Sequence, residues 1–234
     1  MMPFVKLMTE QTGVRAASTL AGFNICEYAG GQASPADFDA LEQYMGEARE
    51  QMFFPVQTHS AEVRTVPCDA EELVGVDAVV TDVPGVVVGV HTADCLPLLM
   101  ADVEMGIVAA VHCGWRGTVA GIARKALRQM VKLGARTERV VATMGPHICP
   151  ECFEVGEDVA LQFPEEAVVR MQGQKPHVSL ATAVTMQLQA EGVIKIERPC
   201  ICSKCNERFY SVRRQGYELT ERTLTAIKCE RVQS

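Results

Sequence analysis

The chain has 234 residues, of which 48% are hydrophobic and 22% charged, as is typical of folded globular proteins and not of disordered ones. Its formal net charge of −7 excludes a basic surface for nucleic acid spread over the whole domain. No apolar run approaches the roughly 18 residues of a membrane span, and the N-terminal residues lack the apolar core of a signal peptide. We therefore expect a cytoplasmic protein with no nucleic-acid or membrane partner.

The ten cysteines and five histidines limit the chemistry that the chain can carry. Disulfide scaffolds contain roughly 8–10% cysteine, which is more than this chain has, so we expect reduced thiols and no disulfide framework. A chain of this length buries roughly 70% of its unfolded surface and needs no cross-link for stability. Five histidines can supply one three-ligand metal site, but they cannot supply several imidazole-rich sites.

The first legible elements are apolar runs in the middle of the chain. Their residues are continuously apolar, which predicts strands that are buried on both faces. The predicted strands span residues 77–81, 86–91, 96–102 and 107–112. A turn at 82–85, which contains a Pro-Gly pair, separates the first two.

Helices and strands alternate in the second half of the chain. Apolar residues with helical spacing predict a helix over about 118–133, ended by Gly134. The later elements are a strand at 139–144, a short helix near 157–163, a helix at 181–191 and a strand at 193–197. No repeat or linker interrupts the chain, so we expect one domain over residues 1–234, of the α/β or α+β class.

Polar residues gather where the predicted strands end, and rigid strands commonly position reactive groups in such loops. Three segments of this kind are 57–60 (QTHS), 92–95 (TADC) and 112–117 (HCGWRG). His59, Cys95 and His112 would make a Cys-His-His set, which suits a catalytic zinc with an open position or a single copper ion. The alternative is a buried cysteine with two histidines that are hydrogen-bonded at strand ends.

Five motifs in this chain match a known family in the same order over residues 57–216. QTHS resembles Q-V-H-G, TADCLPLLMAD resembles T-A-D-C-x-P-V-L-L, and VAAVHCGWRGTVAGI resembles V-A-A-x-H-A-G-W-R-G-x-x-x-G. MGPHICPECFEVGEDV resembles L-G-P-A-I-G-x-x-x-Y-E-V-G-x-E-V, and FYSVRRQG resembles F-F-S-Y-R-R-x-G. The chain therefore resembles the laccase-domain family of purine nucleoside phosphorylases, which is also labelled multicopper polyphenol oxidoreductase or YfiH-like.

The resemblance implies a single-domain α+β fold, a four-layer αββα sandwich with mixed sheets. It implies a zinc ion held by His59, Cys95 and His112. We expect Cys95 to be required for catalysis, because both reactions would use this ion. It also implies phosphorolysis of adenosine, inosine and methylthioadenosine to base plus ribose-1-phosphate, and hydrolytic deamination of adenosine. The expected partners are purine nucleosides and phosphate, and the expected assembly is a monomer or a small homo-oligomer.

The chain departs from the family pattern at several positions. The N-terminal helix of the family carries an Asn-Arg pair that is missing from residues 34–46 (SPADFDALEQYMG). Ser60 and Cys113 replace the usual Gly and Ala, and the late T-G-R motif survives only as 220–222 (TER). The three ligand positions are intact, so these changes bear on substrate preference.

Further polar residues have candidate roles beside the ligands. Asp94 could relay protons or orient a histidine ligand, or it could simply cap a turn. Arg116 is a candidate anchor for phosphate, and Arg213 and Arg214 are candidates for binding substrate, although each arginine could instead be structural. His147 could line the pocket.

Two other activities compete with the nucleoside chemistry. A phenol oxidase with one copper could use two histidines and a cysteine, whereas a multicopper oxidase needs more imidazoles than five histidines provide. A protein that edits cell-wall precursors, or a non-catalytic metal-binding protein, is the third possibility.

A second cysteine pattern consists of Cys149-x-x-Cys152 and Cys202-x-x-Cys205. Two such pairs can hold a structural zinc, but the roughly 50 residues between them exceed the usual 15–20 of a zinc ribbon. The spacing therefore favours four thiols without a metal.

Overall fold

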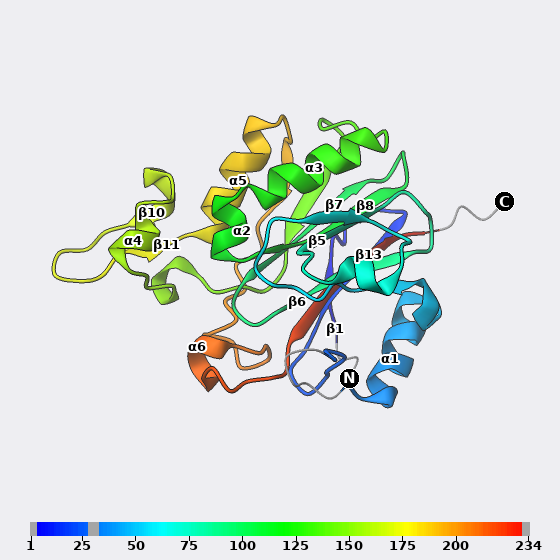
Figure 1. The fold of residues 1–234 in the computed structure, drawn as a ribbon, viewed down its shortest axis with the longest axis horizontal. Helices are drawn as coiled ribbons and strands as arrows, with labels where there is room; N and C mark the ends of the chain where they lie inside the picture. The colour runs from blue at the N-terminus through cyan, green and yellow to red at the C-terminus, as the bar shows by residue number, and fades with distance from the viewer. Residues whose placement is uncertain (1–3, 28–32, 231–234) are drawn as a thin grey trace.

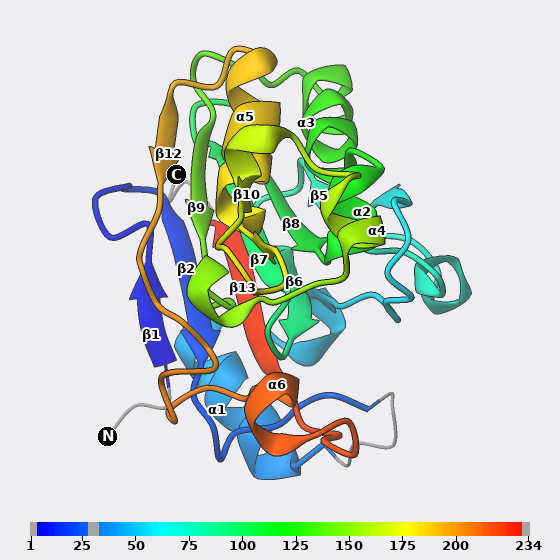
Figure 2. The same ribbon diagram turned by 90° about the vertical axis from the view of Figure 1, so that its left-hand side faces the viewer.

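The computed structural model describes residues 4–27 and 33–230. Two β-sheets lie face to face, and helices cover their outer surfaces (Figures 1 and 2). The helices and the mixed sheets confirm the α+β fold class.

The six-stranded sheet has the order β12-β9-β7-β8-β5-β4. Its strands are β4 (Val63–Thr65), β5 (Ala78–Thr81), β7 (Leu96–Asp102), β8 (Ile107–Cys113), β9 (Val141–Met144) and β12 (Lys195–Glu197). The four inner strands pair antiparallel, and the edge strands β4 and β12 are added in parallel. Pro97 pairs with His112 across β7 and β8, so the residues that precede β7 lie beside the end of β8.

The five-stranded sheet has the order β1-β2-β13-β6-β3. Its strands are β1 (Phe4–Leu7), β2 (Val14–Thr19), β3 (Met52–Phe53), β6 (Val87–Thr92) and β13 (Thr223–Cys229). A separate two-stranded ribbon joins β10 (Val168–Val169) to β11 (His177–Val178). The sequence analysis predicted β6 but none of the other strands in this sheet.

Alternate side chains of the central strands fill two different cores. In β7, Leu98 and Met100 pack toward the helices, whereas Leu99 and Ala101 pack between the two sheets. This explains why the strand is apolar at almost every position, and it confirms that the strand is buried on both faces.

Helices complete the outer layers of the molecule. The amphipathic helix α3 (Ile122–Lys132) and the uncharged helix α5 (Leu180–Ala190) cover the six-stranded sheet. Helix α1 (Pro35–Met45) covers the other sheet, and its buried face packs on Val87 of β6 and Leu224 of β13. Figure 1 shows the order helix, sheet, sheet, helix, which is the expected αββα arrangement.

The predicted helix at 118–133 is two helices in the structure. Helix α2 (Trp115–Val119) ends before Gly121, whose backbone φ of 76° lies in the left-handed region, and α3 begins at the next residue. The remaining helical segments are α4 (Glu157–Ala160), α6 (Val212–Gln215) and the 3₁₀ turns Arg49–Gln51, Ala70–Leu73, Pro150–Cys152 and Glu165–Ala167. Among the described residues, no helix combines the length and apolar character that crossing a membrane requires.

Candidate active site and metal centre

The structure brings His59, Cys95 and His112 together at one end of the six-stranded sheet. One ligand atom from each of the three lies within 4.8 Å of the others. Cys95 Sγ is 3.7 Å from His59 Nε2, and the two imidazole rings meet edge to face with centroids 4.8 Å apart. The segments therefore place a soft thiol and two imidazoles around one point, although they lie far apart in the sequence.

Asp77 binds two of these segments, the one that contains His59 and the one that contains His112. Its carboxylate is fully buried and accepts a 2.6 Å hydrogen bond from Nδ1 of His112, which leaves Nε2 for the cluster. It also accepts hydrogen bonds from the backbone N–H groups of Thr58, His59 and Ser60, at 3.1, 3.0 and 2.8 Å, and from Ser60 Oγ at 2.8 Å. A carboxylate that fixes the far nitrogen of a histidine is a common support for a metal ligand.

The sequence analysis missed Asp77 and considered Asp94 for the role of orienting a histidine. The sequence does contain a signal for Asp77, because this acidic residue is the first of the apolar run DAVVT. A charged residue at the start of a buried strand needs hydrogen-bond partners, which indicates a role in holding other residues. Asp94 has other partners: its Oδ1 accepts from Ser203 Oγ and its Oδ2 accepts from Arg213 N, both at 2.7 Å.

The electrostatics of the cluster favour the thiolate form of Cys95. Burial works to raise the pKa of this thiol, but His112 and His59 beside it lower the pKa to about 6. Burial works to lower the pKa of His112, but Cys95 and Asp77 raise it to about 9. Burial likewise opposes the charge on Asp77, yet the hydrogen bonds from His112 and Ser60 hold the pKa of its carboxyl below the ordinary value. The thiolate is the form that binds metals.

The cluster is open to the surface on one side. His59 is exposed, Cys95 is half-buried and His112 is buried. Gly114 lies directly against the ligands: a Cβ atom there would be 2.9 Å from His59 Cδ2 and 3.4 Å from Cys95 Sγ. Three protein ligands with an accessible fourth side match the ligand chemistry of a catalytic zinc, so the residues present fit that ion.

Two ligand loops contain a strained backbone. Three residues other than glycine have positive φ in the described segments, and two of them are His59 at 60° and Asp94 at 95°. Such conformations cost about 1–3 kcal/mol each and persist where the surroundings enforce them. Asp77 binds the N–H of His59, while Ser203, Arg213 and Ile148 N bind Asp94.

The predicted arginines occupy different environments. Arg116 is exposed at the start of α2, and its guanidinium lies over the Trp115 ring at 4.4 Å. Arg213 is also exposed and donates from Nη2 to the Glu154 carbonyl at 3.1 Å.

Arg214 and His147 have structural contacts. The Arg214 guanidinium donates to the carbonyls of Ser203, Lys204 and Phe209 at 2.6, 2.8 and 2.5 Å, so it fastens a loop. His147 is buried, with Nδ1 2.8 Å from the Gly145 carbonyl, and burial lowers the pKa of its imidazole. Their roles in substrate binding stay predictions.

Comparison with known proteins supports the assignment of a family. A model of the family described as multi-copper polyphenol oxidoreductase laccase matches residues 6–230, and the chain belongs to this family. An adenosine deaminase RL5 from an unknown prokaryotic organism is 38% identical, with 94% of this chain and 91% of that protein covered. A purine nucleoside phosphorylase of Deinococcus radiodurans is also 38% identical, covering 89% of this chain and 83% of the relative.

Solved structures share the fold. The Bacillus licheniformis hypothetical protein YfiH superposes with a TM-score of 0.85 at 21% identity, covering 97% of this chain and 99% of that one.

Proposed function

We propose that the protein is a zinc-dependent purine nucleoside phosphorylase that also deaminates adenosine. The observation that carries this proposal is the convergence of His59, Cys95 and His112 on an accessible point, with Asp77 behind His112. Relatives that are 38% identical over most of the chain are named adenosine deaminase and purine nucleoside phosphorylase, which supports the same substrate class. Inosine and methylthioadenosine are the further proposed substrates.

The zinc ion would be held by His59 Nε2, Cys95 Sγ and His112 Nε2. When bound, zinc supplies a Lewis acid that polarises oxygen ligands and makes a bound water acidic. Asp77 keeps His112 in the required tautomer, because its carboxylate accepts a hydrogen bond from Nδ1–H and so keeps the proton on that nitrogen. Gly114 leaves space for the three ligands to approach one another.

Phosphorolysis breaks the bond between C1′ of the ribose and the purine, and a phosphate oxygen takes the place of the base at C1′. The reaction needs a cation that holds the phosphate. We assign this role to Arg116, whose exposed guanidinium follows His112 by four residues at the same end of β8. Arg213, which is exposed and lies beside Asp94, is the second candidate.

Deamination replaces the amino group at C6 of adenine with an oxygen from water, and ammonia leaves. It needs no phosphate, so the two reactions can share one nucleoside site and differ in their use of Arg116. We propose Asp94 as a positioning residue for the loop of Cys95, because its carboxylate ties this loop to Ser203 and to the start of α6.

A multicopper oxidase receives no support from the positions of the other histidines. Across the described residues, which include all five histidines, potential metal-binding groups form at two places. One is the cluster above and the other contains four cysteines, so His91, His147 and His177 join neither.

The test is the initial rate on adenosine with and without phosphate, with inosine, adenine and hypoxanthine resolved by chromatography. Wild type should release adenine only with phosphate, and inosine in either case. Cys95→Ala should abolish both reactions. Cys113→Ala is the matched control, because Cys113 is buried in the core, outside the ligand cluster. Full activity of Cys95→Ala without metal would refute the proposal, as would oxidation of phenols with no turnover of adenosine.

A further inference from the structure

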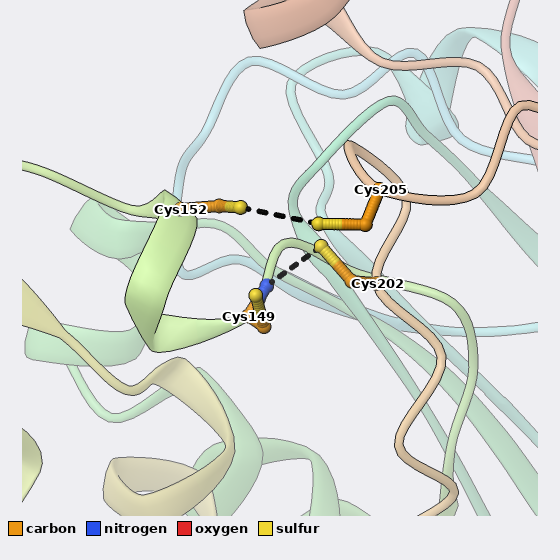
Figure 3. A group of neighbouring side chains, drawn as sticks. All are labelled: Cys149, Cys152, Cys202 and Cys205. Atoms are coloured by element: carbon orange, nitrogen blue, oxygen red, sulfur yellow. Dashed lines mark hydrogen bonds between the residues drawn. The ribbon is translucent and has the colours of Figure 1, made fainter.

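Four cysteines from two distant loops meet at a place separate from the ligand cluster. Figure 3 shows Cys149 and Cys152 on one loop and Cys202 and Cys205 on the other, with Cys152 and Cys205 directed toward each other. The four sulfur atoms all lie within 4.8 Å of one another, and those of Cys152 and Cys205 are 3.4 Å apart. Nothing in the proposed nucleoside chemistry uses these residues.

The fold brings the two cysteine pairs together although they are far apart in the sequence. Cys149 precedes the 3₁₀ turn Pro150–Cys152 that follows β9, and Cys152 is the last residue of that turn. Cys202 and Cys205 lie between β12 and α6. A parallel β-bridge between His147 and Cys202 joins the loops. Its hydrogen bonds run from His147 N to the Ile201 carbonyl at 3.1 Å and from Ser203 N to the His147 carbonyl at 3.0 Å.

We propose that Cys149, Cys152, Cys202 and Cys205 bind one structural zinc ion as four thiolates. Zinc–sulfur distances of about 2.3 Å in a tetrahedron place the sulfur atoms roughly 3.8 Å apart, which agrees with the separations here. A disulfide needs about 2.05 Å between its two sulfur atoms, which is shorter than the 3.4 Å between those of Cys152 and Cys205. Disulfides would also join the cysteines two by two, whereas all four sulfur atoms gather at one place. Each pair also has the C-x-x-C spacing of a zinc knuckle.

The surroundings of the four sulfurs suit an anionic tetrathiolate site. Cys149 N donates to Cys202 Sγ at 3.4 Å, as a backbone N–H does when it supports a thiolate ligand. Lys204 lies inside the second knuckle, and the Arg214 guanidinium binds the carbonyls of Ser203 and Lys204. The Arg214 guanidinium therefore places one positive charge beside the backbone of the Cys202–Cys205 loop.

This zinc would act on the nucleoside site through Asp94. Ser203, which lies between the cysteines of the second knuckle, donates to Asp94 Oδ1, and Arg213 N at the start of α6 donates to Oδ2. Asp94 immediately precedes Cys95 in the chain. A metal that fixes the Cys202–Cys205 loop therefore fixes Ser203 directly. It also supports Arg213, because the neighbouring Arg214 of α6 donates hydrogen bonds to the same loop.

The experiment measures bound metal in the purified full-length chain by elemental analysis. Wild type should bind two zinc ions per chain, and both Cys95→Ala and the double variant Cys152→Ser/Cys205→Ser should bind one. Cys200→Ser is the matched control, because Cys200 is exposed beside the cluster but outside it, and it should keep both ions.

X-ray absorption of the zinc left in Cys95→Ala tests the site with all four cysteines intact. Four sulfur ligands at about 2.3 Å are expected, and no nitrogen ligands. This reading does not depend on whether the double variant folds. The proposal would be overturned if purified Cys95→Ala contained no zinc, if its zinc had nitrogen ligands, or if its bound metal were iron. An unchanged metal content in the Cys152→Ser/Cys205→Ser variant would also overturn it. The experiment separates this inference from the proposed function. If wild type and Cys95→Ala each bound a single zinc with four sulfur ligands, the four-cysteine site would be supported and zinc at His59, Cys95 and His112 would be refuted.

Discussion

Replacing Asp77 with asparagine tests whether one buried carboxylate organises the metal ligands. The substitution keeps the size of the side chain and removes its charge and one acceptor. Oδ1 accepts from His59 N and His112 Nδ1, while Oδ2 accepts from Thr58 N, Ser60 N and Ser60 Oγ. An amide has a single oxygen, so its NH₂ group must face one of these two sets of donors.

The expected loss follows from the contacts that the amide cannot make. A hydrogen bond to a charged group contributes about 1.5–3 kcal/mol. Removal of a carboxylate that supports a metal-binding histidine typically weakens metal affinity or activity by about 10- to 100-fold. Because Asp77 is fully buried, we also expect a stability loss of about 3–5 kcal/mol, as for other broken buried ion pairs.

Zinc affinity would be measured by competition with a chelator, and stability by urea denaturation. Asp102→Asn is the matched control, since Asp102 is also fully buried and its carboxylate accepts from Arg139 and from Arg136 N at the opposite end of β7. The control should lose comparable stability and keep its zinc affinity. If Asp77→Asn binds zinc as tightly as Asp102→Asn does, the carboxylate does not organise the ligands.

Three further substitutions or measurements follow from the structure. Arg116→Ala should slow phosphorolysis by roughly 10- to 150-fold, the loss of one charge-assisted contact, and leave deamination nearly unchanged; equal effects in both assays would move the phosphate role to Arg213. Gly114→Ala should weaken zinc binding, because its Cβ would lie 2.9 Å from His59, and unchanged chelator competition would count against the crowding argument. Thiol titration under denaturing, non-reducing conditions with a chelator should recover all ten cysteines, and a stable recovery of only a few would contradict a reduced protein.

The sequence predicts five strands of the six-stranded sheet and misses the short edge strand β4. The four inner strands are the clearest, because burial on both faces leaves an uninterrupted apolar signal. The prediction fails for β13, which lies at the centre of the other sheet. Lys228 in that strand is only 3% exposed, and it pairs with Glu47 at 2.9 Å and Glu230 at 3.0 Å. A lysine indicates an exposed position in a sequence pattern, and its partners, one of them distant in the chain, cannot be deduced from spacing.

Contacts between residues distant in the chain also explain which parts of the site the sequence could not predict. The motifs indicated His59, Cys95 and His112, because each lies in a short and distinctive segment. Asp77 acts through hydrogen bonds to residues 17 to 35 positions away, which no local motif records. The gap between the two cysteine pairs argued against a second metal, yet a β-bridge between loops brings them together.

Asp77 and Asp94 support different ligand loops of the cluster. Asp77 accepts hydrogen bonds from the loop of His59, where φ is 60°, and it is fully buried directly before β5. Asp94 has a φ of 95° itself, and its carboxylate is held by the cysteine-bearing loop and α6. Since both strained loops depend on buried carboxylates, ligand geometry is set by the sheet on one side and by the Cys202–Cys205 loop on the other. A loose cysteine loop would therefore displace Cys95 while leaving His112 and Asp77 in place.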